Sequence, residues 1–430
     1  MPNWIVIATI GSLGDLHPCL ALALELGRRG HRVTIASTEY YRGKVEELGI
    51  EFHSMRPNWD PTDQELIRQC ENLRRGPEIL YRKLVLPELR ATYDDLISVA
   101  AGADLLIAGE LVYAAPLVAE KLSLRWVSGI LSPFSFFSSQ DPSILVNAPS
   151  LIHLRKMGWR AYRAGLNLGR LATWHWSNPV RDLRRELGLR TDCDPLFRDK
   201  YSPDLVLALF SRWLAQPQLD WPRQTIQTGF VYFDRQKAED APSTELTAFL
   251  AAGHAPIIFT QGSIAVHHPG SFYEVSIEAA KRLGRRAVLL GAKTMAEASS
   301  SQVLVLPYLP YSQVFPHGAV NVHQGGSGTS GQALRAGRPM LVVPYGWDQP
   351  DNAARIQRLG AGLHLARTNY SPDTTTKALH RLLHEPHFAR RAAQVGAAMK
   401  EENGEALACD AIEAVLTAHN TPVSSGKSLR

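Results

Sequence analysis

The sequence predicts an α/β protein with a doubly wound parallel sheet in each half of the chain. Short apolar runs rich in β-branched residues, which are typical of strands buried on both faces, alternate with helical stretches from residue 4 onward. The same alternation begins again near residue 256, after a stretch that contains several prolines. With 430 residues, each half is also long enough to bury a core of its own.

The first half opens with a strand at residues 4–10, a glycine-containing turn at 11–14 and a helix at 19–29. Gly30 follows where helices commonly end, and a strand at 32–36 completes a right-handed βαβ unit. Further strands are predicted at residues 104–108, 125–128 and 205–209, and helices at 64–75, 88–100 and 111–121. Residues 131–190, which are rich in aromatic side chains, interrupt this pattern.

The second half is divided by its periodicity into strands predicted at residues 256–260, 287–291, 302–306, 319–323, 340–343 and 362–365. We therefore expect a first domain at residues 1–215, an interdomain linker at 216–240, a second domain at 241–404, a C-terminal helix at 405–418 and a flexible tail at 419–430.

The charge of the chain is a weak guide to its partners. Lys and Arg number 46 against 41 Asp and Glu, a net charge of +5, and no block of five like charges occurs. The densest basic cluster, at residues 181–190, alternates with acidic residues and leucines, so we expect a solvated helix face and no nucleic-acid partner. The four cysteines lie far apart and predict no disulfide framework.

Targeting signals are not expected either. The apolar run near the start is short and lacks a basic flank, and no run reaches the length of a transmembrane helix. We therefore expect a cytoplasmic protein without a transmembrane segment. Peripheral contact with a membrane remains open, as do the monomer and the homodimer.

One motif has the composition of a phosphate site. The sequence from His323 to Thr329, His-Gln-Gly-Gly-Ser-Gly-Thr, leaves a predicted strand and enters a helix. Glycines let the backbone approach an anion, and the free amides and dipole at the helix start favour a phosphate. The motif is neither a Walker A loop nor a G-x-G-x-x-G fingerprint. A tight strand–helix turn without a ligand is the structural alternative.

A second motif follows the strand predicted at residues 340–343. Asp348 and Gln349 stand at the C-terminal edge of the sheet, where ligands bind in α/β folds. A carboxylate beside a carboxamide can hold several sugar hydroxyls, because one accepts hydrogen bonds and the other accepts and donates them. The alternative is that Asp348 serves as a helix N-cap.

With these motifs, the sequence resembles the family 1 inverting glycosyltransferases of the GT-B fold. It is most similar to the bacterial branch that includes antibiotic, macrolide and sterol glucosyltransferases. The resemblance extends from residue 5 to about residue 416 and is most specific at residues 11–18 and 307–362. It implies two Rossmann-like domains that face a deep cleft, an acceptor bound by the first domain, and a nucleotide sugar bound by the second. It also implies that the C-terminal helix packs back on the first domain.

The resemblance assigns donor-binding roles residue by residue. It implies diphosphate contacts from the histidine and loop of the first motif and from the Gly-Ser pair after the first strand of the second domain: His323, Gly326, Ser327, Gly328, Thr329, Gly262 and Ser263. Asp348 and Gln349 match the pair that holds the hexose 3- and 4-hydroxyls. Tyr308 falls where the family stacks an aromatic ring on the base. Plant members have a ribose-binding Glu where this chain has Gly331, which leaves Gln332 as the candidate for the ribose.

The resemblance also implies the catalytic base. Many relatives have a histidine three residues before Pro18, where this chain has Asp15, as the antibiotic and sterol branches do. Asp15 would accept the proton of the acceptor hydroxyl as that hydroxyl attacks the anomeric carbon. An ordinary Asp is a weak base, so we expect leaving-group stabilisation to contribute much of the catalysis. His17 is the competing base, and a turn or N-cap role is the structural alternative for Asp15.

The acceptor site is less well defined by the sequence. Phe134, Phe136 and Phe137, with His17, are the candidates for an apolar acceptor pocket, although the same aromatic residues also fit an ordinary core. Residues 192–194, Asp-Cys-Asp, match the D-x-D pattern of metal-dependent transferases, but they lie outside both motifs and predict a surface loop. We expect no metal and no bound cofactor.

Together these observations predict a metal-independent, inverting transfer of a hexose to a hydroxyl of a largely apolar small molecule. UDP-glucose is the expected donor and a dTDP-sugar its alternative. The acceptor classes are natural products, polyketides, sterols and lipids. The rival functions are a sugar-nucleotide epimerase or hydrolase with the same donor site, and a catalytically silent sugar-nucleotide-binding subunit.

Overall fold

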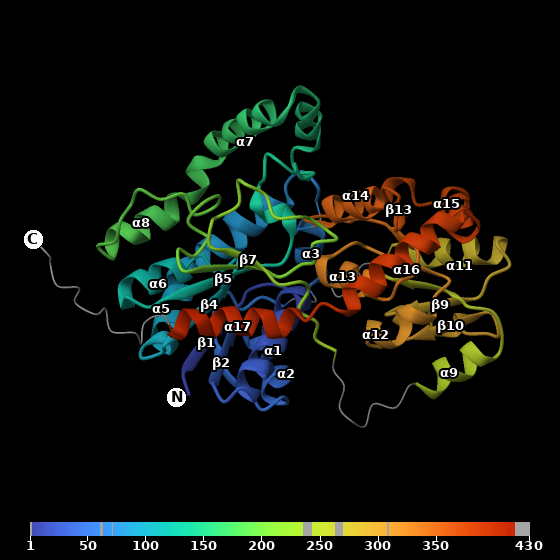
Figure 1. Ribbon diagram of the computed structural model, residues 1–430, viewed down its shortest axis with the longest axis horizontal. Coiled ribbons are helices and arrows are strands. Elements are labelled where there is room, and N and C mark those ends of the chain that lie inside the picture. The colour runs from blue at the N-terminus through green and yellow to red at the C-terminus, as the bar shows by residue number, and fades with distance from the viewer. Residues whose placement is uncertain are drawn as a thin grey trace, which may run out of the picture.

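The computed structural model describes residues 2–60, 63–70, 72–234, 243–262, 270–307 and 309–417. Two parallel sheets lie side by side with helices on both faces of each (Figure 1). Ser263, Tyr308 and the tail expected at residues 419–430 lie outside the described residues.

The first sheet has the strand order β3-β2-β1-β4-β5-β6-β7, and every neighbouring pair is parallel. Its central strands are almost wholly buried, because helices cover both faces and leave no side for polar residues. The strands are β1 (Trp4–Ala8), β2 (Arg32–Ser37), β3 (Glu51–Ser54), β4 (Leu105–Gly109), β5 (Trp126–Ile130), β6 (Leu205–Ala208) and β7 (Thr225–Gln227).

The helices of the first domain connect and cover these strands, and one of them stands away from the sheet at the top of Figure 1. That helix is α7, which follows the short 3-10 helix η5 (Pro149–Met157). The α-helices are α1 (Leu13–Arg28), α2 (Arg42–Glu46), α3 (Gln64–Cys70), α4 (Gly76–Ile79), α5 (Leu89–Ala100), α6 (Ala115–Leu122), α7 (Trp159–Thr173) and α8 (Asn178–Glu186).

Helix α1 begins six residues before the expected start at residue 19. Proline is disfavoured inside a helix, and the helix predicted from the sequence starts directly after Pro18. A capping box overrides that signal, because the side chain of Ser12 accepts a backbone N–H of the first turn while the side chain of Asp15 accepts the N–H of Ser12. The glycine turn and the helix start therefore merge, and Asp15 lies in the first turn of α1.

The second sheet has the strand order β10-β9-β8-β11-β12-β13 within the described residues, again all parallel. Each strand predicted in the second half is present, and no end differs from its prediction by more than one residue. The strands are β8 (Ile257–Thr260), β9 (Ala287–Leu290), β10 (Val303–Leu306), β11 (Val320–His323), β12 (Met340–Val342) and β13 (Gly362–His364).

The helices of the second domain flank this sheet, and the last helix leaves it for the first domain (Figure 1). They are α9 (Thr244–Ala251), α11 (Phe272–Arg282), α12 (Tyr311–Val314), α13 (Ser327–Arg335), α14 (Gln349–Leu359), α15 (Pro372–His384), α16 (Pro386–Lys400) and α17 (Gly404–Thr417).

Part of the expected linker belongs to the first sheet. Within residues 216–240, β7 pairs in parallel with β6. This strand was not predicted, because it is only three residues long and half exposed, which leaves almost no periodic signal. Residues 228–234 then run along the boundary between the domains, where Phe230 packs in a core cluster that includes Leu334 and Met399 of the second domain.

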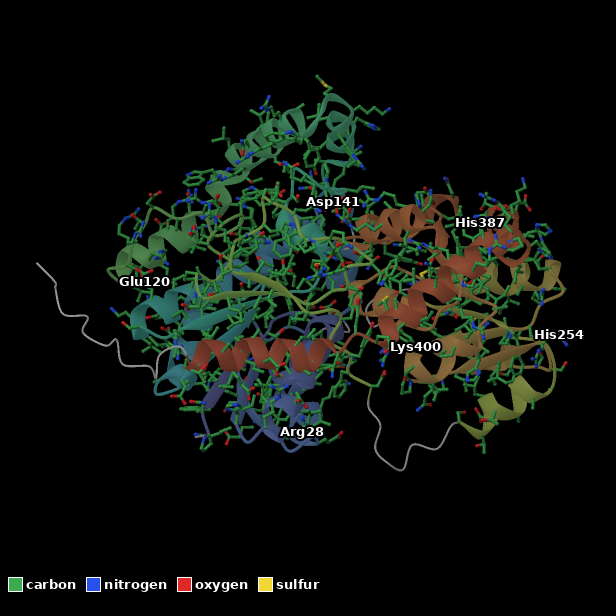
Figure 2. The ribbon with its side chains drawn as sticks, viewed as in Figure 1. Arg28, Glu120, Asp141, His254, His387 and Lys400 are labelled. Carbon is green, nitrogen blue, oxygen red and sulfur yellow. The ribbon has the colours of Figure 1, made fainter. Side chains whose placement is uncertain are left out.

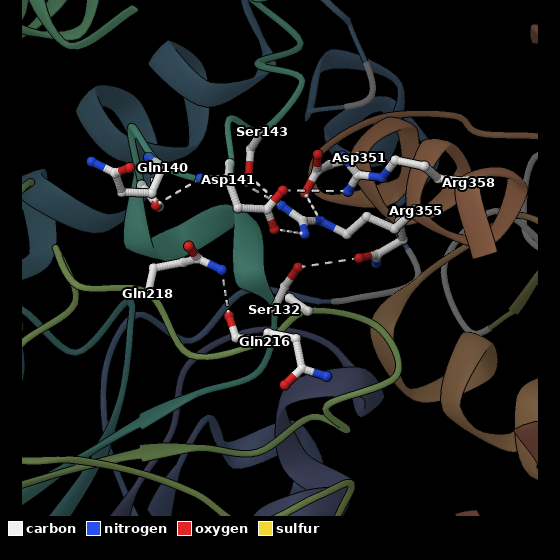
Figure 3. Close-up of polar contacts among 12 residues, drawn as sticks. Ser132, Gln140, Asp141, Ser143, Gln216, Gln218, Asp351, Arg355 and Arg358 are labelled. Atoms are coloured by element: carbon white, nitrogen blue, oxygen red, sulfur yellow. Dashed lines mark hydrogen bonds and ion pairs between the residues drawn. The ribbon is translucent and has the colours of Figure 1, made fainter. Parts of the chain in front are cut away.

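Buried charges also join the two domains. The guanidinium of Arg355 on α14 pairs with Asp351 on the same helix at 2.7 Å and with Asp141 of the first domain. Asp141 lies where the two domains meet in Figure 2, and the close-up in Figure 3 shows Arg355 and Arg358 reaching it together. Arg355 also donates to Ser143 Oγ at 3.1 Å. The start of α14 is thereby fixed against the first domain.

Helix α17 packs against α1 and β6 of the first domain. Its buried face, which includes Cys409 and Ile412, joins the core cluster of the first sheet. At the rim, Arg29 pairs with Asp410 at 2.6 Å and with Glu413 at 2.7 Å. The last helix of the chain therefore ties the second domain back to the first.

The described part of the chain contains no helix that is both long and apolar enough to span a bilayer.

Replacing Ile412 should weaken the fold. Ile412→Ala leaves a cavity where a fully buried side chain of α17 meets the first sheet, so we expect the free energy of unfolding to fall by about 2–5 kcal/mol. Leu407→Ala on the same helix is the matched control, because that side chain is 50% exposed and its loss should change stability by less than about 0.5 kcal/mol. Urea unfolding of both variants measures the difference, and equal midpoints would contradict the packing of α17.

Candidate active site

A cavity of about 1110 Å³ lies between the two sheets. The segments that follow β1, β4 and β5 line it from the first domain, and those that follow β8, β9 and β11 line it from the second. Because parallel strands end together, the chain segments beyond their carboxyl ends gather at one edge of each sheet, which is where α/β proteins bind ligands.

Asp15 projects into this cavity from the first turn of α1. Its Oδ2 accepts hydrogen bonds from the Ser12 backbone N–H at 2.8 Å and from Ser12 Oγ at 3.2 Å. Gly11 has a φ of +140°, and a Cβ there would overlap the Asp15 carboxylate. The glycine-serine turn is therefore shaped around this side chain, which serves both as a capping residue and as a cavity carboxylate.

Burial makes Asp15 a stronger base than an ordinary aspartate. Loss of hydration raises its pKa to about 6, against the lowering effect of the Ser12 hydrogen bonds and with a further contribution from the charge of Glu110. At neutral pH the carboxylate is mostly ionised yet accepts a proton more readily than an exposed one. This changes the expectation of a weak base that the sequence alone supports.

Glu110 and Lys200 form a polar pair in the wall of the cavity near Asp15. Lys200 Nζ lies 3.4 Å from Glu110 Oε2 and donates to the Ser135 carbonyl at 2.8 Å. Burial lowers the pKa of Lys200, while the charge of Glu110 opposes that shift. No local pattern predicts this pair, since its members are 90 residues apart in the chain.

His17 also lines the cavity, with its ring centroid 5.1 Å from that of Phe233. Burial lowers the pKa of His17 to about 3, so the imidazole is neutral at pH 7. Its Nε2 is buried and has no hydrogen-bond partner among the described residues. As a base it is weaker than Asp15, which favours Asp15 for proton abstraction.

The start of α13 has the geometry of an anion site. Gly326 is the N-cap, and no side chain in the described part of the chain caps this helix. Gly326, Ser327, Gly328 and Thr329 all line the cavity. Uncapped amides and the positive end of the helix dipole favour a phosphate here. The Ser327 hydroxyl, however, already donates to the Leu131 carbonyl across the domain boundary.

His323 lies behind this loop and does not line the cavity. Its side chain is fully buried, and its Nδ1 accepts a hydrogen bond from the Gly325 N–H at 3.1 Å. Burial lowers the pKa of His323 to about 3, so the ring is uncharged. In this structure it fixes the backbone of the loop, whereas the sequence analysis expected it to contact the diphosphate directly.

Asp348 and Gln349 face the cavity from the start of α14. Asp348 occupies the N-cap position but makes no capping hydrogen bond, and its Oδ2 accepts instead from Asn352 Nδ2 at 2.8 Å. Gln349 Oε1 accepts the backbone N–H groups of Tyr345 and Gly346, at 2.7 and 3.2 Å. The carboxylate of Asp348 and the amide nitrogen of Gln349 are therefore available to bind a ligand.

The electrostatics of Asp348 connect it to Asp15. Burial raises the pKa of Asp348 to about 7, the Asn352 hydrogen bond lowers it, and the charges of Asp15 and Glu110 raise it further. Carboxylates from both domains therefore share one weakly hydrated cavity. The preceding residue, Trp347, has a φ of +59°, a strained conformation for a bulky residue, and it also lines the cavity.

The other residues expected to bind the sugar donor differ in their surroundings. Gly262 lines the cavity with a φ of +72°, and a Cβ there would overlap the Gln324 amide. Gln332 also lines it, and its Nε2 donates to Asp234 Oδ1 at 2.9 Å. A Cβ at Gly331 would lie 2.8 Å from the ring of Phe230, so this site has no room for the Glu of plant relatives.

The aromatic candidates divide into two groups. Phe134 and Phe137 line the cavity. Phe136 does not: it is buried in the core with its ring stacked 4.1 Å from Trp221, so its assignment to the acceptor pocket was wrong. The alternation follows from the 3-10 turn at Pro133–Phe136, which sends neighbouring rings to opposite sides.

Many apolar residues that line the cavity were not predicted from the sequence. They come from segments between residues 59 and 197 in which no local motif marks a ligand site. Tyr311 of the second domain was missed as well, and Gln324 lines the cavity although it was given no role within the His323–Thr329 motif. The missed side chains of the first domain include Trp59, Leu66, Ile67, Leu80, Leu84, Leu145, Val146, Leu151, Leu166, Leu196 and Phe197. Trp176, one of the tryptophans that the sequence offered for an apolar acceptor pocket, also lines the cavity.

No three His, Cys, Asp or Glu side chains in the described ranges gather as a group that could hold a metal ion. Asp194 of the D-x-D sequence forms an ion pair with Arg170 on α7.

Replacing Asp348 by Asn should raise the stability of the protein at high pH. The pKa of Asp348 is about 7 in the folded state and 3.8 in the reference state, so the folded protein holds its proton more tightly. The contribution of this group to stability is therefore present below pH 4 and lost as the pH rises to about 7. At pH 8 we expect the free energy of unfolding of Asp348→Asn to exceed that of the wild type by on the order of 4 kcal/mol, with the gain vanishing near pH 4.

Urea unfolding of the ligand-free protein across this pH range measures the effect. Asp182→Asn on α8, where the side chain is exposed, is the control and should change stability by less than about 0.5 kcal/mol. A gain for Asp348→Asn that is the same at pH 4 and pH 8 would contradict a buried, charge-coupled carboxylate.

Comparison with known proteins places these features in a family. Residues 5–128 match the family described as the glycosyltransferase family 28 N-terminal domain, and residues 289–408 match the erythromycin biosynthesis protein CIII-like C-terminal domain. O-mycaminosyltylonolide 6-deoxyallosyltransferase of Streptomyces fradiae is 32% identical over 426 residues, which cover 95% of this chain and 96% of that protein. Sterol 3-beta-glucosyltransferase of Yarrowia lipolytica is 27% identical over 94% of this chain, which spans 28% of that longer protein.

Solved structures agree on the fold. The calicheamicin glycosyltransferase superposes with a TM-score of 0.73 at 19% identity, over 98% of this chain and 99% of that one. The spinosyn rhamnosyltransferase, solved with thymidine diphosphate, gives a TM-score of 0.67 at 17% identity, over 96% of this chain and 100% of that one. The fold, the two matched domains and the full-length relative lead to one conclusion: this chain belongs to the GT-B glycosyltransferases, sugar-transferring enzymes whose family includes the macrolide and sterol glycosyltransferases.

Proposed function

We propose that this glycosyltransferase inverts the anomeric centre as it moves a hexose from a nucleoside diphosphate to a hydroxyl of a large apolar acceptor. The observation that carries the proposal is the pairing of Asp15 from the first domain with Asp348 from the second in one cavity. One carboxylate is suited to accept a proton and the other to hold sugar hydroxyls.

The donor half of the proposal rests on the second domain. The open amides at the start of α13 suit a diphosphate, and Asp348 and the Gln349 amide suit the hexose hydroxyls. UDP-glucose is the proposed donor, in line with the glucosyl transfer named for the sterol enzymes. A dTDP-sugar is the alternative, which the thymidine diphosphate complexes of the matched structures support.

The chemistry is a single in-line displacement. The acceptor oxygen forms a bond to the anomeric carbon, Asp15 takes the hydroxyl proton, and the bond from that carbon to the diphosphate oxygen breaks. The charge that develops on the departing diphosphate meets the amides and dipole of α13, which are in place before the reaction. One displacement inverts the configuration, and these backbone groups stabilise the leaving group without requiring a metal ion.

The acceptor half rests on the shape and lining of the first domain. The cavity is large enough for a polycyclic or macrocyclic molecule, and most of the side chains that line it from the first domain are apolar. The relatives act on a macrolide, by name O-mycaminosyltylonolide, and on sterols. We accordingly propose a polyketide, sterol or similar natural product as the acceptor class.

Asp15→Asn should abolish transfer while leaving donor binding intact. The amide keeps an oxygen for the Ser12 hydrogen bonds but accepts no proton, so we expect kcat to fall by about 10²–10⁴. In the wild type, kcat/KM should fall as the pH drops through about 6, because the base becomes protonated. Product formation by mass spectrometry and nucleotide affinity by calorimetry are the two measurements.

Asp182→Asn on α8 serves as the control and should retain full activity. Undiminished transfer by Asp15→Asn would remove Asp15 as the base, and a loss of nucleotide affinity equal to the loss of rate would show that it acts only on structure.

A substrate panel tests the reaction class. We expect glycosides from polycyclic or macrocyclic alcohols with UDP-glucose or dTDP-glucose, with a β-linkage from the α-linked donor in the product NMR spectrum. An α-linked product would overturn inversion. Free sugar or an epimerised donor without acceptor, together with no glycoside from any alcohol, would favour the hydrolase or epimerase alternative.

A further inference from the structure

The positive charge of the chain is concentrated in one segment around α7. Residues 142–181 hold six of the 46 Lys and Arg residues and none of the 41 Asp and Glu residues. The rest of the chain therefore has 40 basic and 41 acidic residues, which nearly cancel. The net charge of +5 is thus a property of this segment rather than of the whole surface.

Helix α7 has two faces with different environments. Gly165, Leu166, Gly169 and Thr173, which recur at the spacing of one helical face, line the cavity. The opposite face carries Leu168 and Leu171, which are 68% and 70% exposed. Apolar side chains are thus exposed on the outside of the same helix that forms part of the cavity wall.

Further exposed apolar groups flank this face. Met157 is 75% exposed before α7, Trp159 is 42% exposed at its start, and Trp174 is 41% exposed just after its end. In the described part of the chain, these three residues and the two leucines are five of the eleven large hydrophobic side chains that are exposed. We call these five residues the α7 apolar surface.

Unpaired cations surround the α7 apolar surface. Arg155, Lys156, Arg160 and Arg163 are exposed, and none of them makes an ion pair with a described residue. Arg160 lies over the ring of Trp159 at 5.2 Å. Figure 1 shows α7 standing clear of both sheets, and Figure 2 shows nitrogen-bearing side chains reaching into solvent along it.

This composition fits a lipid surface better than a protein interface. Trp, Met and Arg are also enriched in protein interfaces, but Lys is depleted there, and residues 142–181 carry cations without a single acidic residue, which suits a surface of uniform negative charge. Helices that lie in the plane of a membrane combine Lys and Arg with Trp and Leu in this way, because the cations reach the headgroups while the apolar groups enter the acyl boundary.

We propose that the α7 apolar surface and its four unpaired cations dock the protein on an anionic lipid bilayer. The inner face of α7 then places the cavity next to the lipid, so that an apolar acceptor can enter from the bilayer without crossing water. This second step rests on the proposed function, whereas the docking itself does not.

Vesicle sedimentation of the full chain tests the docking. We expect binding to phosphatidylcholine vesicles that contain phosphatidylglycerol, at least ~10-fold weaker binding to phosphatidylcholine alone, and weakening by salt. Leu168→Ser/Leu171→Ser and Arg160→Gln/Arg163→Gln should each reduce the binding by ~10-fold or more. These side chains lie outside the cavity lining, so both variants should keep the thermal melting curve of the wild type.

Lys377→Gln/Arg390→Gln is the charge-matched control, since both residues are exposed on α15 and α16 of the second domain, and its vesicle binding should equal that of the wild type. Asp15→Asn should also bind vesicles normally, which separates failure of the docking from failure of the proposed function. Absence of vesicle binding, or equal loss in the control, would overturn the proposal. So would wild-type dimers that the α7 variants dissociate without any vesicle binding, because the surface would then be an interface between copies.

Discussion

The buried guanidinium of Arg355 holds the two halves of the active site in a fixed relation. It pairs with Asp351 on its own helix and with Asp141 of the first domain, and it donates to Ser143. A buried charge is costly unless every group around it is paired, and here the partners come from both domains. Asp351 completes the set by accepting the N–H of Ile144 at 2.9 Å. The helix that begins at Asp348 and Gln349 is therefore positioned by a segment of the first domain that continues into the cavity wall.

That arrangement brings negative charges together in a weakly hydrated space. Asp15, Glu110 and Asp348 all face one cavity, and burial and mutual repulsion raise the pKa values of Asp15 and Asp348. Hydroxyl groups are hydrogen-bond donors, so a bound substrate that carries them can donate to these carboxylates the hydrogen bonds that water donates to exposed ones. These charged carboxylates make the protein less stable than uncharged side chains at the same positions would. Such a loss of stability is common at active sites.

Local patterns predicted the parts of the fold that local forces determine. The buried strands of both sheets and the glycine loop at residues 323–329 are encoded in short stretches, and the structure places them as expected. Phe136 and the pair Glu110–Lys200 depend on contacts between distant segments, which periodicity does not report. The start of α1 was misplaced because the helix was predicted to begin after Pro18, whereas the Ser12 capping box begins it at Leu13. His323 was expected to contact the ligand, but its ring is buried behind the glycine loop. A motif shows that a histidine stands at the end of a strand, but it does not show whether the ring points into the cavity or into the core.

The backbone at Trp347 has a consequence for the way this protein can change. A tryptophan at a φ of +59° stores strain directly before Asp348, and a glycine there would relax it. The same replacement would remove a ring from the cavity wall and free the backbone directly before the carboxylate. Relief of strain and loss of the wall are therefore inseparable at this residue, so an improvement here requires a compensating change elsewhere in the wall.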